Sequence, residues 1–107
     1  MLGFVRLVGD DRVIVEPAHD RLLVRPAPPL AGLIEVRGLG IRRVAYEPVA
    51  VVGAIVELAA TDAMRIPEPE SEHATICGVR LPRLAVAGGV EPLPIVISYL
   101  STVSAID

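Results

Sequence analysis

The segment Pro26-Ala27-Pro28-Pro29 is the strongest constraint on the fold, because proline lacks the N–H that a β-ladder needs. Two runs rich in β-branched residues, 12–16 and 21–25, precede it, and the turn-forming residues 17–20 separate them. The sequence therefore predicts a β-hairpin followed by a stiff crossing to the next block of the chain.

Five further segments have distinct patterns. Residues 4–8 predict a strand that ends at Gly9, and residues 49–58, which are nearly free of charge, predict a central strand buried on both faces. The polar, proline-rich residues 62–72 predict a surface connection, and residues 75–86 predict two short strands hinged near Pro82. Residues 93–106 predict a closing helix that Pro92 and Pro94 introduce, although their β-branched content would suit a strand nearly as well.

Length and composition limit the possible functions. A chain of 107 residues is long enough for one domain, and 52% hydrophobic with 21% charged residues is typical of a globular protein. The net charge of −3 argues against nucleic acid or an anionic membrane as a partner, since both select a basic surface. Only 3% of the residues are aromatic, so no platform for stacking single-stranded bases is visible.

Cys77 is the only cysteine, which excludes an internal disulfide and a thiolate zinc cluster. We interpret it as a small buried apolar residue in a protein of the reducing cytoplasm. The apolar stretches 49–56 and 93–106 are shorter than the roughly 20 residues of a membrane span, and no basic-then-apolar signal peptide opens the sequence.

Two clusters of charge could carry chemistry. In the block 30–43, LAGLIEVRGLGIRR, Glu35 and Arg37 would lie on one side of an extended segment, and Gly38 and Gly40 would allow positive φ or close approach to a ligand. The alternative is a cross-strand ion pair of little energetic value. The adjacent carboxylates of Asp10-Asp11 repel each other unless a cation shares them or one is protonated, the alternative being a solvated turn.

The succession LVGDDRV, IEVRGLGI and MRIPEPE resembles the C-terminal catalytic domain of bacterial HPr kinase/phosphorylase, in particular its short single-domain forms, over nearly all of residues 1–107. The resemblance implies an α/β fold, with the mixed and mainly antiparallel sheet of the phosphoenolpyruvate-carboxykinase-like P-loop core and a C-terminal helix. It also implies ATP-dependent phosphorylation of a serine on the phosphocarrier HPr, a cytoplasmic location and a homo-oligomer.

The resemblance assigns roles to individual residues. Asp10 and Asp11 match the acidic pair of which one member accepts the serine proton, and which member does so stays open. Glu35 matches the magnesium-binding glutamate, within a signature that includes Arg37, Gly38 and Gly40. We therefore expect the three carboxylates to share a divalent ion. Arg65 matches an arginine that stabilises charge on the transferring phosphoryl group, the alternative being a solvated loop cation.

The sequence also departs from the family. Nine residues precede Asp10, and neither the phosphate-cradling G-x-x-x-x-G-K-[ST] loop nor the histidine ahead of it is present. All ten basic residues are arginines, so no loop lysine exists, and residues 87–91 lack the arginines used in dephosphorylation. We expect the first strand, P-loop and helix of the core to be missing and ATP to bind weakly. A non-catalytic regulatory or binding module derived from the family is the alternative function.

Overall fold

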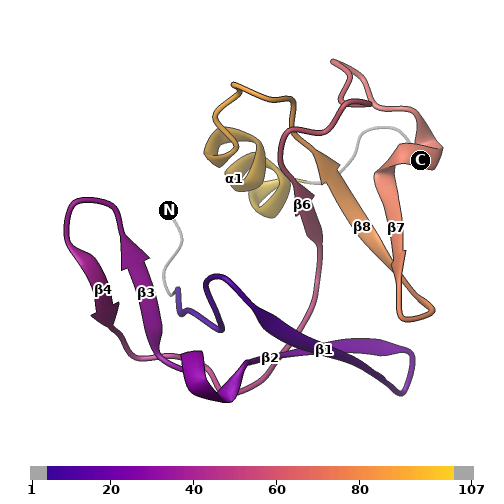
Figure 1. The fold of residues 1–107 in the computed structure, drawn as a ribbon. Coiled ribbons are helices and arrows are strands. Elements are labelled where there is room, and N and C mark those ends of the chain that lie inside the picture. Colours follow the sequence, from indigo (N-terminus) through magenta and orange to yellow (C-terminus); the bar gives the residue numbers. More distant parts are fainter. Residues whose placement is uncertain (1–4, 103–107) are drawn as a thin grey trace. The chain divides into compact units, whose positions relative to one another are not determined.

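The computed structural model describes residues 5–102 and divides into two compact units (Figure 1). The amino-terminal unit extends to Val52 and includes Ile76–Val79. The carboxyl-terminal unit consists of Gly53–Thr75 and the chain from Arg80 onward. Each unit is described by itself below.

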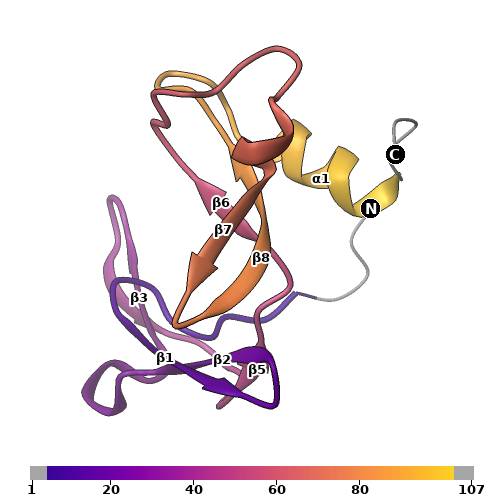
Figure 2. The ribbon, with the colours of Figure 1, turned by 90° about the vertical axis from the view of Figure 1, so that its right-hand side faces the viewer.

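The predicted hairpin is confirmed in the amino-terminal unit. Strand β1 (Val13–Ala18) pairs antiparallel with β2 (Arg21–Pro26), and β5 (Ala50–Val51) pairs with the other edge of β2 (Figure 2). Only His19 and Asp20 connect β1 to β2, with φ of 50° and 64°. Two successive positive φ values are typical of the type I′ turn, whose twist matches that of the flanking strands. The turn is therefore tighter than the four residues expected from the sequence.

The stiff crossing is confirmed as well. Pro28–Leu30 form a short 3₁₀ helix, after which β3 (Leu33–Val36) and β4 (Gly40–Arg43) make a separate antiparallel hairpin. Its turn is closed by the N–H of Leu39, which donates to the Val36 carbonyl at 2.9 Å. Gly38 takes the third position of this turn with a φ of 91°, a conformation that glycine adopts without strain.

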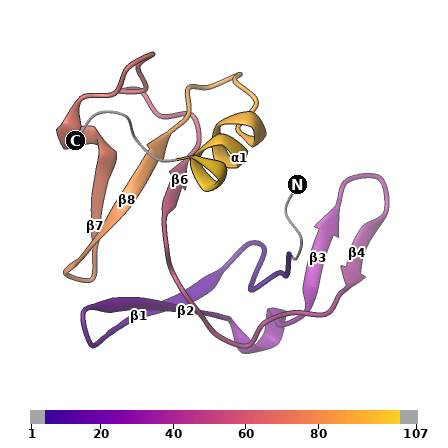
Figure 3. The same cartoon turned by 180° about the vertical axis from the view of Figure 1, so that it is seen from behind.

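The carboxyl-terminal unit contains a parallel strand pair and the helix (Figure 3). Strand β6 (Ile55–Glu57) runs parallel to β8 (Val79–Ala85), and β7 (His73–Ile76) lies on the other side of β8. The predicted surface connection between β6 and β7 is confirmed; it is mostly exposed and ends in a 3₁₀ helix at Pro69–Glu72. Helix α1 (Leu93–Ser101) confirms the predicted helix as far as Ser101, and residues 103–106 lie outside the described part.

The expected fold class is confirmed in its coarse features. The described chain is α/β, its strands are mainly antiparallel, and one helix follows them near the C-terminus. The strands form three small sheets instead of the single mixed sheet that we expected. No helix among residues 5–102 is long and apolar enough to cross a membrane.

The predicted central strand over 49–58 is wrong. The segment forms two short strands, β5 and β6, in different sheets, and the boundary between the two units falls between Val52 and Gly53. Val49, Val51 and Leu58 are each at least half exposed. The β-branched composition indicated extended backbone correctly, but it did not distinguish one long buried strand from two short, partly exposed strands separated by residues 52–54.

Two other expectations need correction at the β7–β8 connection. The turn lies at Cys77-Gly78, with φ of 51° and 78°, and Pro82 lies inside β8. Pro82 precedes the residues that pair with β6, which begin at Arg83, so its missing N–H does not interrupt that ladder. Cys77 is exposed, and not buried as we interpreted it, because a tight turn places its side chain outside the sheet.

The strand expected over 4–8 is reduced to one bridge. Leu7 makes a single parallel bridge with Tyr46, and Glu47 donates its N–H to the Leu7 carbonyl at 2.7 Å. Phe4 lies outside the described residues. Among residues 5–9 only Leu7 is therefore in a β-bridge, and the acidic residues that follow lie in a bend and not at the end of a ladder.

Candidate functional site

The candidate site of the amino-terminal unit is organised by one hydrogen bond between distant residues. The Oδ2 atom of Asp10 accepts the backbone N–H of Glu35 at 2.9 Å, across 25 positions of the sequence. A carboxylate that accepts from a backbone N–H makes a charge-assisted hydrogen bond, which is stronger than one between neutral groups. This contact ties the acidic turn to strand β3 and so brings together two segments that the sequence analysis identified independently.

The same residues line a pocket of about 650 Å³. Its lining combines three carboxylates with four aliphatic side chains: Asp10, Asp11, Leu30, Leu33, Ile34, Glu35 and Ile41. No basic side chain contributes to this lining, so the pocket suits a cation or a hydroxyl group better than a bare anion. A phosphate group would enter it favourably only together with a cation.

The two aspartates differ in how they are held. Asp10 is fixed by its bond to Glu35, whereas the Asp11 side chain is 83% exposed and has only a loose contact of 3.8 Å with Arg12. Gly9 makes this turn possible, because a Cβ at that position would lie 2.5 Å from Cγ1 of Val13. The acidic pair thus contains one anchored and one exposed carboxylate.

The signature residues lie on the β3–β4 hairpin, with one correction. Glu35 is in β3, but Arg37 is in the turn, so the two charges do not lie on one side of the same extended segment as we expected. Among the described residues no ion pair joins them. Gly38 and Gly40 both have positive φ, and within residues 5–102 no atom outside their chain neighbours lies within 4 Å of the Cβ that either would carry. The turn geometry accounts for these glycines, without a close approach by another part of the chain.

The expected three-carboxylate metal cluster is not formed within residues 5–102, where no three acidic, histidine or cysteine side chains are placed to hold one ion. The donor chemistry still fits magnesium, which proteins usually bind through one or two carboxylates together with water and substrate phosphates. One or two of the carboxylates at this pocket would be sufficient for such a site, with water and substrate phosphates completing the coordination.

Arg65 belongs to the other unit. It is exposed, in the connection that leads from β6 to the 3₁₀ helix at Pro69–Glu72. The structure groups Asp10, Asp11 and Glu35 around one pocket and does not include Arg65 in its lining.

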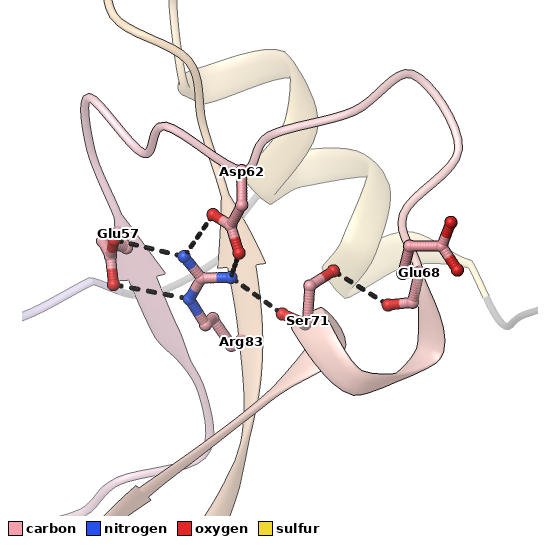
Figure 4. A network of polar contacts seen from close by, with 5 residues as sticks. All are labelled: Glu57, Asp62, Glu68, Ser71 and Arg83. Carbon is pink, nitrogen blue, oxygen red and sulfur yellow. Dashed lines mark hydrogen bonds and ion pairs between the residues drawn. The ribbon is translucent and has the colours of Figure 1, made fainter.

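Sequence reasoning missed an arginine network in the carboxyl-terminal unit (Figure 4). The side chain of Arg83 is 9% exposed and donates to both Glu57 and Asp62, with distances of 2.8 Å to 3.4 Å. It also donates to the backbone carbonyl of Ser71 at 2.9 Å. The signal in the sequence was an arginine in a β-rich run, which becomes informative only when β6 and β8 are known to pair in parallel.

This network shifts two pKa values. The hydrogen bond from Arg83 is the main reason that the pKa of Asp62 lies below its ordinary value of 3.8, and the two carboxylates raise the already high pKa of Arg83 further. A carboxyl group whose pKa falls on folding stabilises the folded state above its ordinary pKa, and the contribution is lost as the pH drops through the lowered value.

We therefore expect the urea midpoint of the wild-type chain to fall as the pH is lowered below about 3.8. Asp62→Asn should show a smaller fall over the same range, measured by circular dichroism, since its amide cannot be protonated there. The effect will be modest, because Asp62 is half exposed. Glu70→Gln is the control, and a fall in Asp62→Asn equal to that of the wild type would contradict the assignment.

Comparison with known proteins supports the fold alone. No protein-family model and no curated protein matches the sequence. Among solved structures, the chain is similar to the Hpr(Ser) kinase/phosphatase from Coxiella burnetii, with a TM-score of 0.66 and 22% sequence identity. The match covers 86% of this chain and 66% of that one, so this chain spans slightly less than two thirds of the solved protein.

Proposed function

We propose that this chain is part of a phosphotransfer domain that moves the γ-phosphoryl group of ATP to a serine of the phosphocarrier HPr. The observation that carries the proposal is the hydrogen bond from the Glu35 backbone to Asp10, because it joins the acidic pair to the signature hairpin at one pocket. The fold similarity to an Hpr(Ser) kinase/phosphatase supports the proposal, and so does the order of the three motifs in the sequence.

The proposed roles follow from the positions of the carboxylates. The serine hydroxyl enters the acidic pocket, where one member of the Asp10–Asp11 pair accepts its proton as the oxygen attacks phosphorus. Asp10 is the better positioned of the two, since one of its oxygens is already held and the other is left to accept. Glu35 would supply one carboxylate ligand to a Mg²⁺ ion that enters with the ATP phosphates, and the ion when bound would neutralise charge on those phosphates. Arg65 supplies a further positive charge to the transferring group.

Transfer of radiolabelled phosphate from ATP to HPr tests the proposal. We expect transfer from a preparation in which a P-loop segment precedes residue 1, and little from the 107-residue chain, whose basic residues are all arginine. Phosphate positioning supplies much of the barrier reduction in this reaction class. A P-loop-bearing preparation that binds HPr but transfers no phosphate would refute the catalytic proposal.

The 107-residue chain itself is expected to bind Mg-ATP weakly, with a Kd in the millimolar range typical of sites without preorganised phosphate donors. Calorimetric titration measures this directly. Glu35→Ala should weaken the residual binding, and Glu16→Ala on the β1–β2 hairpin is the control. Tight stoichiometric binding by the wild-type chain would show that another segment holds the phosphates.

The second candidate is a non-catalytic module that binds HPr or a second copy of the chain. The 107 residues contain no lysine, the residue type that the family uses for its phosphate contact. HPr binding without transfer in every preparation would support this candidate. Light scattering of the purified chain would test the homo-oligomer that the resemblance implies.

A further inference from the structure

Neighbouring oxygen atoms accept hydrogen bonds from all the N–H groups of the Arg83 guanidinium. An arginine side chain has five N–H donors, and Arg83 makes five hydrogen bonds. The Nε and Nη2 atoms contact the Glu57 carboxylate, Nη1 and Nη2 contact the Asp62 carboxylate, and Nη1 also reaches the Ser71 carbonyl. The arginine side chain is nearly buried, and all of its N–H donors are in hydrogen bonds. The planar guanidinium therefore holds the groups that it contacts in defined positions.

These contacts enclose the connection between β6 and β7. Glu57 is the last residue of β6, Asp62 lies shortly after it, and Ser71 lies in the 3₁₀ helix that ends the connection (Figure 4). The described connection has little support of its own. Its backbone bonds are those from Ala60 to Val86 and from Ser71 to Glu68, and the Ser71 hydroxyl also donates to the Glu68 carbonyl at 2.8 Å. Arg83 is therefore the main link between the two ends of the segment.

Arg65 lies inside the segment that Arg83 closes. It is three positions after Asp62 and six before Ser71, and it is exposed. An exposed side chain on a loose loop loses conformational entropy when it must act at a defined point, and a loop fixed at both ends reduces that loss. The contacts of Arg83 thus limit the positions that the Arg65 backbone can take.

We propose that Arg83 is a positioning residue. Its hydrogen bonds to Asp62 and Ser71 clamp the 58–72 connection and so restrict the backbone around Arg65, which acts in phosphoryl transfer. This inference rests on the proposed function for the role of Arg65. The clamp itself rests only on the five hydrogen bonds and the burial of Arg83.

Limited digestion of the 107-residue chain with trypsin tests the clamp. Arg83→Lys keeps the charge but cannot form the fork, so we expect cleavage after Arg65 to accelerate about tenfold. Cleavage after Arg37, in the other unit, is the internal reference, because general unfolding would accelerate both. Arg80→Lys, an exposed residue of the same strand, is the matched control. Unchanged cleavage after Arg65 would overturn the clamp; should Arg83→Lys fail to fold, Asp62→Ala gives the same test.

Transfer of phosphate to HPr tests the positioning role. We expect Arg83→Lys to lower kcat about tenfold without changing the KM for HPr, and to have less than about a twofold effect when Arg65 is already replaced by alanine. An equal effect of Arg83→Lys in both backgrounds would make Arg83 merely structural and refute positioning. If no preparation transfers phosphate, the proposed function and the positioning role both fail, while the tryptic result still decides the clamp.

Discussion

Replacing Asp10 and Asp11 together by asparagine should lower the turnover of phosphoryl transfer to HPr at least about 100-fold, the usual scale for losing a positioned acid or base. The asparagine side chains are nearly isosteric with the aspartates but cannot accept the serine proton. After Asp10→Asn the side-chain amide oxygen can still accept the Glu35 N–H, so the turn should keep its structure. The measurement is the initial rate with radiolabelled ATP, in a preparation that includes a P-loop segment.

Single variants separate the two aspartates. Asp10→Asn removes charge and keeps the tether to Glu35, whereas Asp10→Ala removes both. If Asp10 is the proton acceptor, both changes should lower turnover by similar factors. If Asp10 only anchors the turn, Asp10→Asn should be nearly as active as the wild type while Asp11→Asn is inactive. Activity retained by the double asparagine variant would refute the role of the pair.

The largest effect on stability is expected for Leu22→Ala. Leu22 in β2 is 1% exposed, and truncation of a fully buried leucine costs about 2–5 kcal/mol, including the cavity that remains. The midpoint of urea unfolding, followed by circular dichroism, measures this cost. Leu39→Ala is the matched control, since that leucine is 67% exposed in the β3–β4 turn and its truncation should change stability by less than about 0.5 kcal/mol. Equal effects of the two changes would mean that Leu22 is not part of a cooperative core.

The elements that the sequence predicted well are those decided by neighbouring residues. The β1–β2 hairpin, the stiff crossing after it and the start of α1 each depend on proline or turn chemistry within a few positions. The position of a turn is predicted less exactly where several turn-forming residues lie close together in the sequence. The sequence predicts a hinge at Pro82, but Cys77-Gly78 makes the turn. Pro82 stays in the strand, because a proline at the beginning of a paired stretch is tolerated there.

The features that the sequence did not predict depend on distant contacts. The parallel pairing of β6 with β8 decides that Arg83 meets Glu57 across 26 positions, and no local pattern indicates it. The candidate site was predicted in part for the same reason. Asp10, Asp11 and Glu35 were chosen by motif and do line one pocket, but their arrangement depends on a bond over 25 positions. A metal position shared by the three carboxylates depends on the directions in which their side chains point, and the motif carries no information about these directions.

The different strand connections of the two units have a consequence for the order of folding. The β1–β2 and β3–β4 hairpins close over loops of two and three residues, whereas the β6–β8 pair joins residues 28 positions apart. Local contacts form fast, and contacts of high sequence separation form late, since the chain must first lose the entropy of a long loop. We expect the amino-terminal hairpins to form before β6 pairs with β8. Newly synthesised chains would then pass through a state in which both hairpins are formed and the arginine-bearing connection is still open.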